Sequence, residues 1–251
     1  MTNLYGDIAE IPDPLPTPAR VLTIGAHPDD AEFGAGGTLA KWAAAGAHVT
    51  ILVVTDGSKG SWDPDADHGA LVAARAREQR KAADRLGAVG IGFLGRVDGE
   101  LEYTMDLRAE VCAWIRRTRP DVVLSHDPWQ RYQLHPDHRA TGLAAVDGVV
   151  AAREPLAFPD QLVDGIGHHR PSALLLWSAD APDHWEPIEG HVEDKIAALL
   201  CHASQGVTTM GGADEGGEKE TAFRRRIERW AQEVGAAAGL TAAESFKRIT
   251  P

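Results

Sequence analysis

Two short stretches of the chain combine histidine and aspartate at spacings that suit metal chemistry: HPDD at residues 27–30 and HPDH at residues 135–138. The first follows an apolar run, where a carboxylate must be solvated, paired or bound, because burial of an unpartnered charge is costly. Zinc in catalytic sites accepts imidazole and carboxylate ligands and keeps a further position for water. His27, Asp30 and His138 would make such a ligand set.

Each motif taken singly also has a structural explanation. The carboxylate of Asp29 or Asp30 could accept amide hydrogen bonds at a helix N-terminus, and HPDH could be a helix cap followed by a surface histidine. Pro136 favours a helix start here, because proline is common at the first helical position. The metal interpretation is favoured if the fold brings both motifs to one place.

The elements around the motifs predict an α/β fold. Short apolar and β-branched runs alternate with helical patterns, which is typical of a parallel sheet with right-handed crossovers. Strands are expected at residues 20–26, 48–57, 89–95, 121–127 and 172–179. Helices are expected at residues 38–47, 70–88, 105–120, 135–153 and 191–204. The predicted architecture is a Rossmann-like three-layer sandwich, with a mostly parallel sheet and helices on both faces.

This architecture predicts where the chemistry lies. In open parallel sheets, ligands bind beyond the carboxyl ends of the strands. The HPDD motif, TDGSKG at residues 55–60 and SHDPWQ at residues 125–130 all lie at the ends of predicted strands. We therefore expect them to converge at one edge of the sheet, with HPDH on the opposite side of the site.

The chain is expected to hold one domain. Residues 1–19 are rich in proline and predict an N-terminal arm, and residues 20–251 form the domain itself. Residues 56–69 and 206–220 are rich in Gly and Asp and predict two long loops, which are usually functional or mobile in a compact domain.

Composition excludes several classes of partner. The formal net charge is -12, from 37 acidic residues against 25 Lys and Arg, which lacks the basic footprint that nucleic acid binding requires. No apolar run approaches the roughly 20 residues that span a bilayer, and the first residues do not have a signal peptide pattern. We expect a cytoplasmic protein without a membrane partner.

The motifs together carry a family resemblance. AHPDDAEFGAGGTLA at residues 26–40, followed by HPDH, resembles the PIG-L/LmbE-like family of zinc-dependent de-N-acetylases, which act mostly on N-acetylglucosamine-containing molecules. TDGSKG, the helix RAREQRKAADRLG at residues 75–87 and VDGEL at residues 97–101 are also similar to family segments. The resemblance extends over nearly the whole chain after Arg20.

The resemblance implies a role for each matching residue. His27, Asp30 and His138 match the metal ligands, Asp29 matches the general base, and His135 matches the histidine that stabilises the tetrahedral intermediate. The implied cofactor is Zn2+, although another divalent metal also fits. It would lower the pKa of water towards roughly 7 and polarise the amide carbonyl.

Further residues are implied to support the reaction. Asp137 matches the acid that orients His135, and we expect their hydrogen bond to raise the pKa of that histidine. Arg75 and Asp98 match positions that hold sugar hydroxyls. Members that serve mycothiol synthesis carry a tyrosine where this chain has Gln133, which argues against that pathway.

The predicted function is hydrolysis of an N-acetyl group from an N-acetylglucosamine-containing small molecule or conjugate, giving acetate and a free amine. One alternative is a zinc amidase that acts on a thiol conjugate or a longer N-acyl group. Another, from a different class, is a non-catalytic nucleotide-binding Rossmann-like module in which HPDD only caps a helix. The sequence leaves assembly into a homo-oligomer open.

Overall fold

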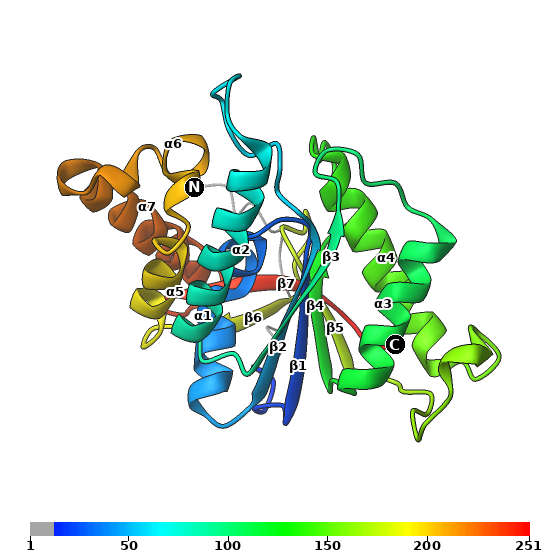
Figure 1. The fold of residues 1–251 in the computed structure, drawn as a ribbon. Helices are drawn as coiled ribbons and strands as arrows, with labels where there is room; N and C mark the ends of the chain where they lie inside the picture. Colours follow the sequence, from blue (N-terminus) through cyan, green and yellow to red (C-terminus); the bar gives the residue numbers. More distant parts are fainter. Residues whose placement is uncertain (1–12) are drawn as a thin grey trace.

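A seven-stranded sheet forms the centre of the computed structural model, which describes residues 13–251 (Figure 1). The strand order is β3-β2-β1-β4-β5-β7-β6. The first five strands in this order are parallel to one another, whereas β7 runs antiparallel to both of its neighbours, β5 and β6. The strands are β1 (Arg20–Gly25), β2 (His48–Thr55), β3 (Gly90–Arg96), β4 (Val122–His126), β5 (Ala173–Trp177), β6 (His184–Pro187) and β7 (Ala243–Ile249).

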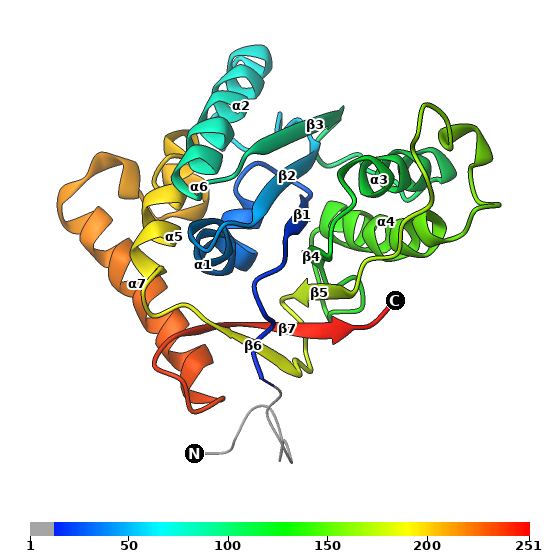
Figure 2. The same ribbon diagram turned by 90° about the horizontal axis from the view of Figure 1, so that it is seen from below.

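Helices cover both faces of the sheet, as Figure 2 shows most clearly. On one face lie α1, α2 and α5, with α7 outside them, and on the other face lie α3 and α4. The helices are α1 (Asp30–Ala44), α2 (His68–Arg85), α3 (Met105–Thr118), α4 (Pro136–Arg153), α5 (Val192–Leu199), α6 (Gly206–Thr209) and α7 (Gly217–Ala236). The predicted three-layer sandwich is confirmed.

Alternation along the central strands divides the core into two layers. Val21 packs with α1 and α2, whereas its neighbours Leu22 and Ile24 pack with α3 and α4, because successive side chains of a strand point to opposite faces. Trp42 of α1 and Ile115 of α3 are both fully buried and fill the two layers. The central strands are therefore covered on both faces, which explains their nearly continuous apolar sequence.

The first helix begins earlier than the sequence suggested. A helix start at residue 38 was expected, but α1 begins at Asp30 and takes in the glycine-rich segment. The glycines allow close packing: a Cβ on Gly34 would lie 2.5 Å from Cδ2 of Trp177, and one on Gly37 would lie 2.7 Å from Cδ1 of Ile188. Close approach to neighbouring side chains, and not a turn, explains these glycines.

The two ends of the domain also differ from expectation. Of the predicted arm, residues 1–12 lie outside the described residues; residues 13–19 are extended, and the backbone N–H of Leu15 donates to Oε1 of Glu186 at 2.8 Å. The expected loop at residues 206–220 instead holds α6, a short 3-10 turn and the start of α7. Strands β6 and β7 were not predicted, because both are short or carry several charged residues.

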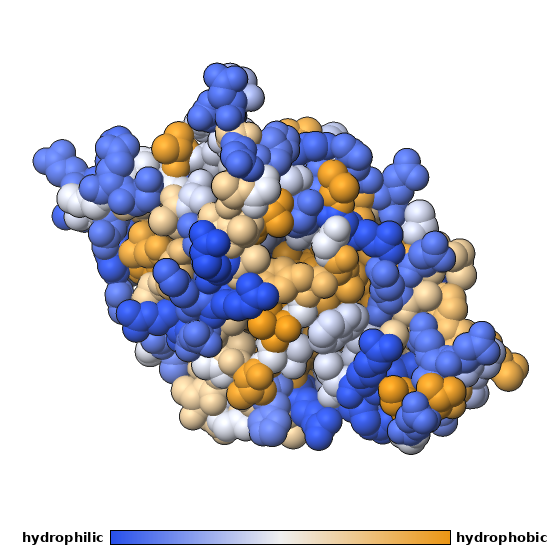
Figure 3. Space-filling view, viewed as in Figure 1, coloured by the Kyte–Doolittle hydropathy of each residue, from blue (hydrophilic) through white to orange (hydrophobic). Residues whose placement is uncertain are grey.

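Residues 56–67 do form a loop, between β2 and α2, and its projecting tip is hydrophilic (Figures 1 and 3). It lies at the same edge of the sheet as the ends of β1 and β4. From β1, the chain adds β2 and β3 on one side of the sheet and then β4 and β5 on the other, so the strand order reverses between β1 and β4. Such switch points are where α/β sheets bind ligands. In the described part of the chain, no helix is long and apolar enough to cross a membrane.

Candidate active site

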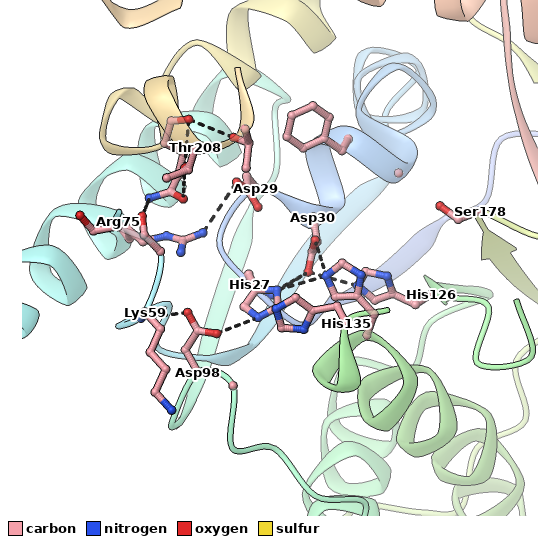
Figure 4. Close-up of a pocket in the computed structure, with 18 of the residues that line it drawn as sticks. His27, Asp29, Asp30, Lys59, Arg75, Asp98, His126, His135, Ser178 and Thr208 are labelled. Atoms are coloured by element: carbon pink, nitrogen blue, oxygen red, sulfur yellow. Dashed lines mark hydrogen bonds and ion pairs between the residues drawn. The ribbon is translucent and has the colours of Figure 1, made fainter. Parts of the chain in front are cut away.

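The two histidine–aspartate motifs meet at this switch point (Figure 4). His27 follows the end of β1 and Asp30 opens α1, whereas His138 lies in the first turn of α4. Helix α4 begins as its sequence predicts, with Pro136 in the first turn and His135 as the N-cap, whose Nδ1 accepts the backbone N–H of Asp137 at 3.3 Å. The carboxyl end of a strand and the start of a helix thus face each other.

Side-chain atoms of the three predicted ligands lie close together. Nδ1 of His27 is 3.2 Å from Nε2 of His138 and 3.3 Å from Oδ2 of Asp30. The second oxygen of Asp30, Oδ1, is 3.4 Å from Nε2 of His138. His27 and Asp30 are buried, and His138 is partly exposed towards the pocket. The ligand roles stay predictions, but the structure brings all three residues together.

The spacing of these atoms fits a divalent metal ion. Ligands about 2.1 Å from a tetrahedral zinc ion lie about 3.4 Å from each other. Nε2 of His138 lies 3.2 Å from Nδ1 of His27 and 3.4 Å from Oδ1 of Asp30, and both separations are close to that edge length. The donors are imidazole and carboxylate, the kinds that zinc and similar ions bind. The residues present therefore fit the metal that the motifs imply.

Hydrogen bonds on the far side of His27 determine which of its nitrogens is free. Its Nε2 lies 3.1 Å from Oδ1 of Asp98 and 3.2 Å from Oδ2 of Asp137, so Nε2 is the protonated nitrogen and Nδ1 is left to bind. Burial opposes a positive charge on this ring, but hydrogen bonds with Asp137, Asp30 and Asp98 outweigh it and raise the pKa of His27 well above its usual value. The surroundings favour a cation at this point.

The position of Asp137 corrects one expectation. Its carboxylate contacts His27 and accepts the backbone N–H of Gly99 at 2.7 Å and that of Leu101 at 3.3 Å, and it makes no hydrogen bond with the ring of His135. The pKa of His135 is therefore lowered and not raised, because burial and the nearby charge of His27 outweigh the attraction of Asp137. The Asp137 carboxylate therefore contacts the ring of His27, a predicted ligand, and not the ring of His135.

Asp29 has a different environment from its neighbour Asp30. It is buried in the pocket wall with φ 111°, in the left-handed region that a side chain rarely adopts. Burial raises its pKa to about 6, although the Arg75 guanidinium, 3.7 Å away, opposes the shift. Burial also acts on Asp30, but there the charges and hydrogen bonds of His138 and His126 hold the pKa well below its usual value.

Arg75 connects the loop after β2 to the first motif. Its Nη2 donates to the carbonyl oxygen of Pro28 at 2.7 Å and its Nη1 to that of Gly57 at 3.1 Å. A Cβ on Gly60 would lie 2.2 Å from Nη1 of Arg75, which explains the second glycine of TDGSKG. Arg75 and Asp98 both line the pocket, as the predicted sugar-binding roles require, and those roles stay predictions.

Other residues in or beside the pocket contact the first motif. His126, at the end of β4, lies 3.1 Å from Oδ2 of Asp30 through its Nε2, which places it within the site. Gln79 of α2 accepts the backbone N–H of Asp29 at 3.0 Å, and nothing in a helical pattern marks it. Trp62, in the loop after β2, also lines the pocket.

The pocket has a volume of about 600 Å³ and extends beyond His27, Asp30 and His138. Its outer wall comes from the loop after β2 and from the C-terminal helices, with Trp62, Gln205, Thr208 and Trp230 among its residues. The polar cluster thus lies at the base of a cavity with an aromatic and hydroxyl-bearing rim, a combination that suits sugar recognition.

Comparison with known proteins identifies the family. Residues 22–149 match the PIG-L family, described as GlcNAc-PI de-N-acetylase. The chain is 35% identical to diacetylchitobiose deacetylase of Thermococcus kodakarensis, over 78% of this chain and 73% of that protein. It is 30% identical to the 1D-myo-inositol 2-acetamido-2-deoxy-alpha-D-glucopyranoside deacetylase of Rhodococcus erythropolis, over 78% and 84% of the two chains. The chain belongs to the PIG-L family, which confirms the resemblance.

The fold of this chain is similar over nearly its whole length to that of a relative of known structure. The N,N'-diacetylchitobiose deacetylase from Pyrococcus horikoshii, in complex with an inhibitor, superposes with a TM-score of 0.84 at 30% identity, covering 99% of this chain and 91% of that one. The nucleotide-binding alternative finds no support in the described residues: Trp177, Lys195 and Ile188 pack against the glycines of α1, where a phosphate would need open space.

Proposed function

We propose that this chain is a divalent-metal hydrolase that removes the acetyl group from an N-acetylglucosamine-containing small molecule. The observation that carries the proposal is the cluster of His27, Asp30 and His138, in which Nε2 of His138 lies 3.2 Å from Nδ1 of His27 and 3.4 Å from Oδ1 of Asp30. Beside this cluster, Oδ2 of Asp29 is buried and has no hydrogen-bond partner. Membership of a family of de-N-acetylases supports the same reaction.

Zn2+ is the metal that this donor set suits best, and His27, Asp30 and His138 would hold it. When bound, such an ion supplies Lewis acidity, which activates water and polarises an amide carbonyl. The hydrogen bonds of Asp98 and Asp137 to His27 place the proton of the neutral ring on Nε2, which leaves Nδ1 as the nitrogen that would bind a metal ion.

Asp29 is placed to act as the general base. It takes a proton from water as the oxygen attacks the acetyl carbon, and the carboxyl pKa of about 6 leaves it ionised, yet able to accept a proton, near neutral pH. The C–N bond then breaks, the amine nitrogen takes up the proton that Asp29 accepted, and acetate leaves. His135 lines the same pocket, and its ring centroid lies 4.5 Å from that of His27. From there it can donate a hydrogen bond to the developing oxyanion.

The substrate is expected to be a small N-acetylglucosamine conjugate. Arg75 and Asp98 border the pocket where sugar hydroxyls would lie, and the cavity leaves room for a group beyond one sugar ring. Relatives named for diacetylchitobiose and for a glucosaminyl inositol support this class. A cytoplasmic location stays a prediction of the sequence.

Acetate release from N,N'-diacetylchitobiose by the zinc-loaded protein tests the proposal. Asp29→Asn should abolish release, whereas the matched control Asp164→Asn, at another left-handed aspartate that is exposed and outside the pocket, should leave it unchanged. Substrates with longer acyl chains and thiol conjugates of the same sugar form the second arm. Turnover of these and none of the acetyl compound would contradict de-N-acetylation and favour a broader amidase.

A further inference from the structure

His126 is a fully enclosed side chain that the proposed reaction does not use. It lies at the end of β4, and the parallel register pairs it with Trp177 of β5. Its ring stacks on that of His138, with centroids 4.2 Å apart and an interplanar angle of 21°, and it meets Trp177 edge-on at 4.8 Å. His126 therefore contacts one of the predicted metal ligands and a second buried aromatic residue.

The hydrogen bonds of His126 determine its tautomer. Nε1 of Trp177 lies 3.0 Å from Nδ1 of His126, and an indole nitrogen can only donate, so Nδ1 must carry a lone pair. The proton of the neutral ring is then on Nε2, which faces Oδ2 of Asp30 at 3.1 Å and donates to it. The opposite tautomer would set two N–H groups against each other at 3.0 Å and a lone pair against a carboxylate.

One weaker contact points the other way and does not change this assignment. The backbone N–H of Ala26 lies 3.4 Å from Nε2 of His126, longer than both contacts that favour a proton there. Oδ2 of Asp30 also accepts the backbone N–H of His27 at 2.7 Å, so two donors hold this oxygen. Oδ1, which faces His138, is the oxygen left for a metal ion.

We propose that His126 is a positioning residue for the metal site: it donates from Nε2 to the ligand carboxylate of Asp30, with its tautomer fixed by Trp177. A nitrogen that carries a proton cannot coordinate a metal ion. His126 is therefore excluded from the ligand set, although its ring nitrogen, Asp30 and His138 lie close enough together to form one. The inference rests on the proposed metal site and selects His27 as its third ligand.

Zinc affinity of the full chain, measured by competition with a chromogenic chelator, tests this assignment. His126→Leu removes the donor and should weaken Zn2+ binding about 10- to 100-fold, the usual effect of losing a hydrogen bond to a ligand. His126→Gln keeps an N–H near the position of Nε2 and should recover most of the affinity. Trp177→Phe removes only the indole N–H and should give an intermediate loss.

A matched control separates positioning from packing. His169 is a half-buried histidine whose Nε2 is hydrogen-bonded to the carbonyl oxygen of Pro120 at 2.7 Å, and it lies outside the pocket. His169→Leu should leave zinc affinity unchanged. Equal affinity in His126→Leu and wild type would overturn the inference, as would a loss in His126→Gln as complete as that of His27→Ala, which would make His126 a ligand.

The tautomer can be read without any variant. In zinc-loaded wild-type protein, nitrogen-15 NMR of the His126 ring should show Nε2 protonated and Nδ1 unprotonated at neutral pH. A proton on Nδ1 would contradict the inference while leaving the metal site intact. Wild-type protein that takes up no Zn2+ would contradict the proposed metal site itself, and the inference with it.

Discussion

The two sides of the pocket satisfy their polar groups differently. On one side, which we call the metal side, Asp30 contacts three histidines, His27, His126 and His138. On the other, which we call the base side, Asp29 lies in a group with Arg75, Gln79, Glu32 and His202. The two carboxylates are adjacent in sequence and differ in almost every contact.

Unpartnered atoms gather on the base side. Among the described residues, buried side-chain atoms without a hydrogen-bond partner include Oδ2 of Asp29, Oε2 of Glu32, Nε of Arg75 and both ring nitrogens of His202, and none from the metal side. A buried polar atom without a partner costs about 1–3 kcal/mol. In the proposed reaction, the metal side would hold its ligand atoms in place, whereas the base side would leave a carboxylate oxygen of Asp29 free to take a proton.

The base side also holds backbone strain. Asp29 stays at φ 111° because its N–H is bound by Oε1 of Gln79, whose amide is oriented in turn by Nε2 donating to Oε1 of Glu32 at 2.6 Å. Strain of this kind costs about 1–3 kcal/mol and persists where surrounding contacts enforce it. Asp30 and Asp29, proposed for metal binding and proton transfer, are thus held by separate sets of contacts although they are adjacent in sequence.

The largest expected effect separates these two assignments. Asp30→Ala should lose both zinc and turnover, whereas Asp29→Ala should keep stoichiometric zinc and lose turnover by about 10³-fold or more, since general base catalysis contributes about 10²–10⁴-fold. Metal content by elemental analysis and acetate release measured on the same preparations check both. Zinc lost from Asp29→Ala would place Asp29 among the ligands and remove the distinction between the sides.

The next effect is on stability, in metal-free protein. The folded-state pKa of Asp29, about 6, lies above its ordinary value of 3.8, so the ionised group destabilises the fold, and this penalty grows as pH rises between those values. Asp29→Asn should therefore raise the unfolding free energy at pH 8 by about 2 kcal/mol, or about 30-fold in the equilibrium constant. Near pH 4 the gain should disappear.

For Asp98, the same substitution is expected to change the unfolding free energy in the opposite direction. Burial acts against its charge, but the hydrogen bond with His27 outweighs this and lowers its pKa, so its contribution to stability is present at neutral pH and is lost as pH falls. Asp98→Asn should destabilise the metal-free protein at pH 8. Denaturant unfolding at several pH values measures both variants. If Asp29→Asn and Asp98→Asn changed the unfolding free energy at pH 8 in the same direction, the proposed difference between the two carboxyl groups would be wrong.

A third effect, about tenfold, tests the strain at Asp29. Gln79→Leu removes the acceptor for its backbone N–H and should lower kcat about tenfold while zinc affinity and KM change little, because the base is displaced and not removed. Gln161→Leu is the matched control: Gln161 also makes two hydrogen bonds, but its partners, Ala109 and Arg116, are not pocket residues. A similar loss of kcat in both variants would indicate general destabilisation.

The sequence predicted the metal side better than the base side, for a physical reason. HPDD carries charged residue types directly after an apolar strand, and HPDH carries them at a predicted helix start. The parallel topology alone brings the carboxyl ends of strands together. Gln79 lies within an ordinary helical pattern, and Trp177 within an ordinary buried strand. Their roles depend on which helix and which strand lie beside the motifs.

The start of α1 and the antiparallel edge were missed for a related reason. Glycines at positions 34, 36 and 37 read locally as a turn, and only the side chains packed against them show why a helix contains them. Strand β7 carries charges whose partners come from distant segments, such as Glu244 with Lys195 at 2.6 Å. Local sequence cannot show that those charges are paired.

The smallest expected effect reaches the metal side through packing. A Cβ on Gly34 would meet the Trp177 ring at 2.5 Å, so Gly34→Ala must displace the indole that holds His126, and zinc affinity should fall about threefold to tenfold. Gly148→Ala is matched in severity, with its Cβ 2.6 Å from Cγ1 of Val111 between α3 and α4. Both variants should unfold at lower denaturant concentration, but only Gly34→Ala should weaken zinc binding. Unchanged affinity in Gly34→Ala would show that the metal side tolerates movement of Trp177, and that its rigidity comes from Asp30 and its histidines alone.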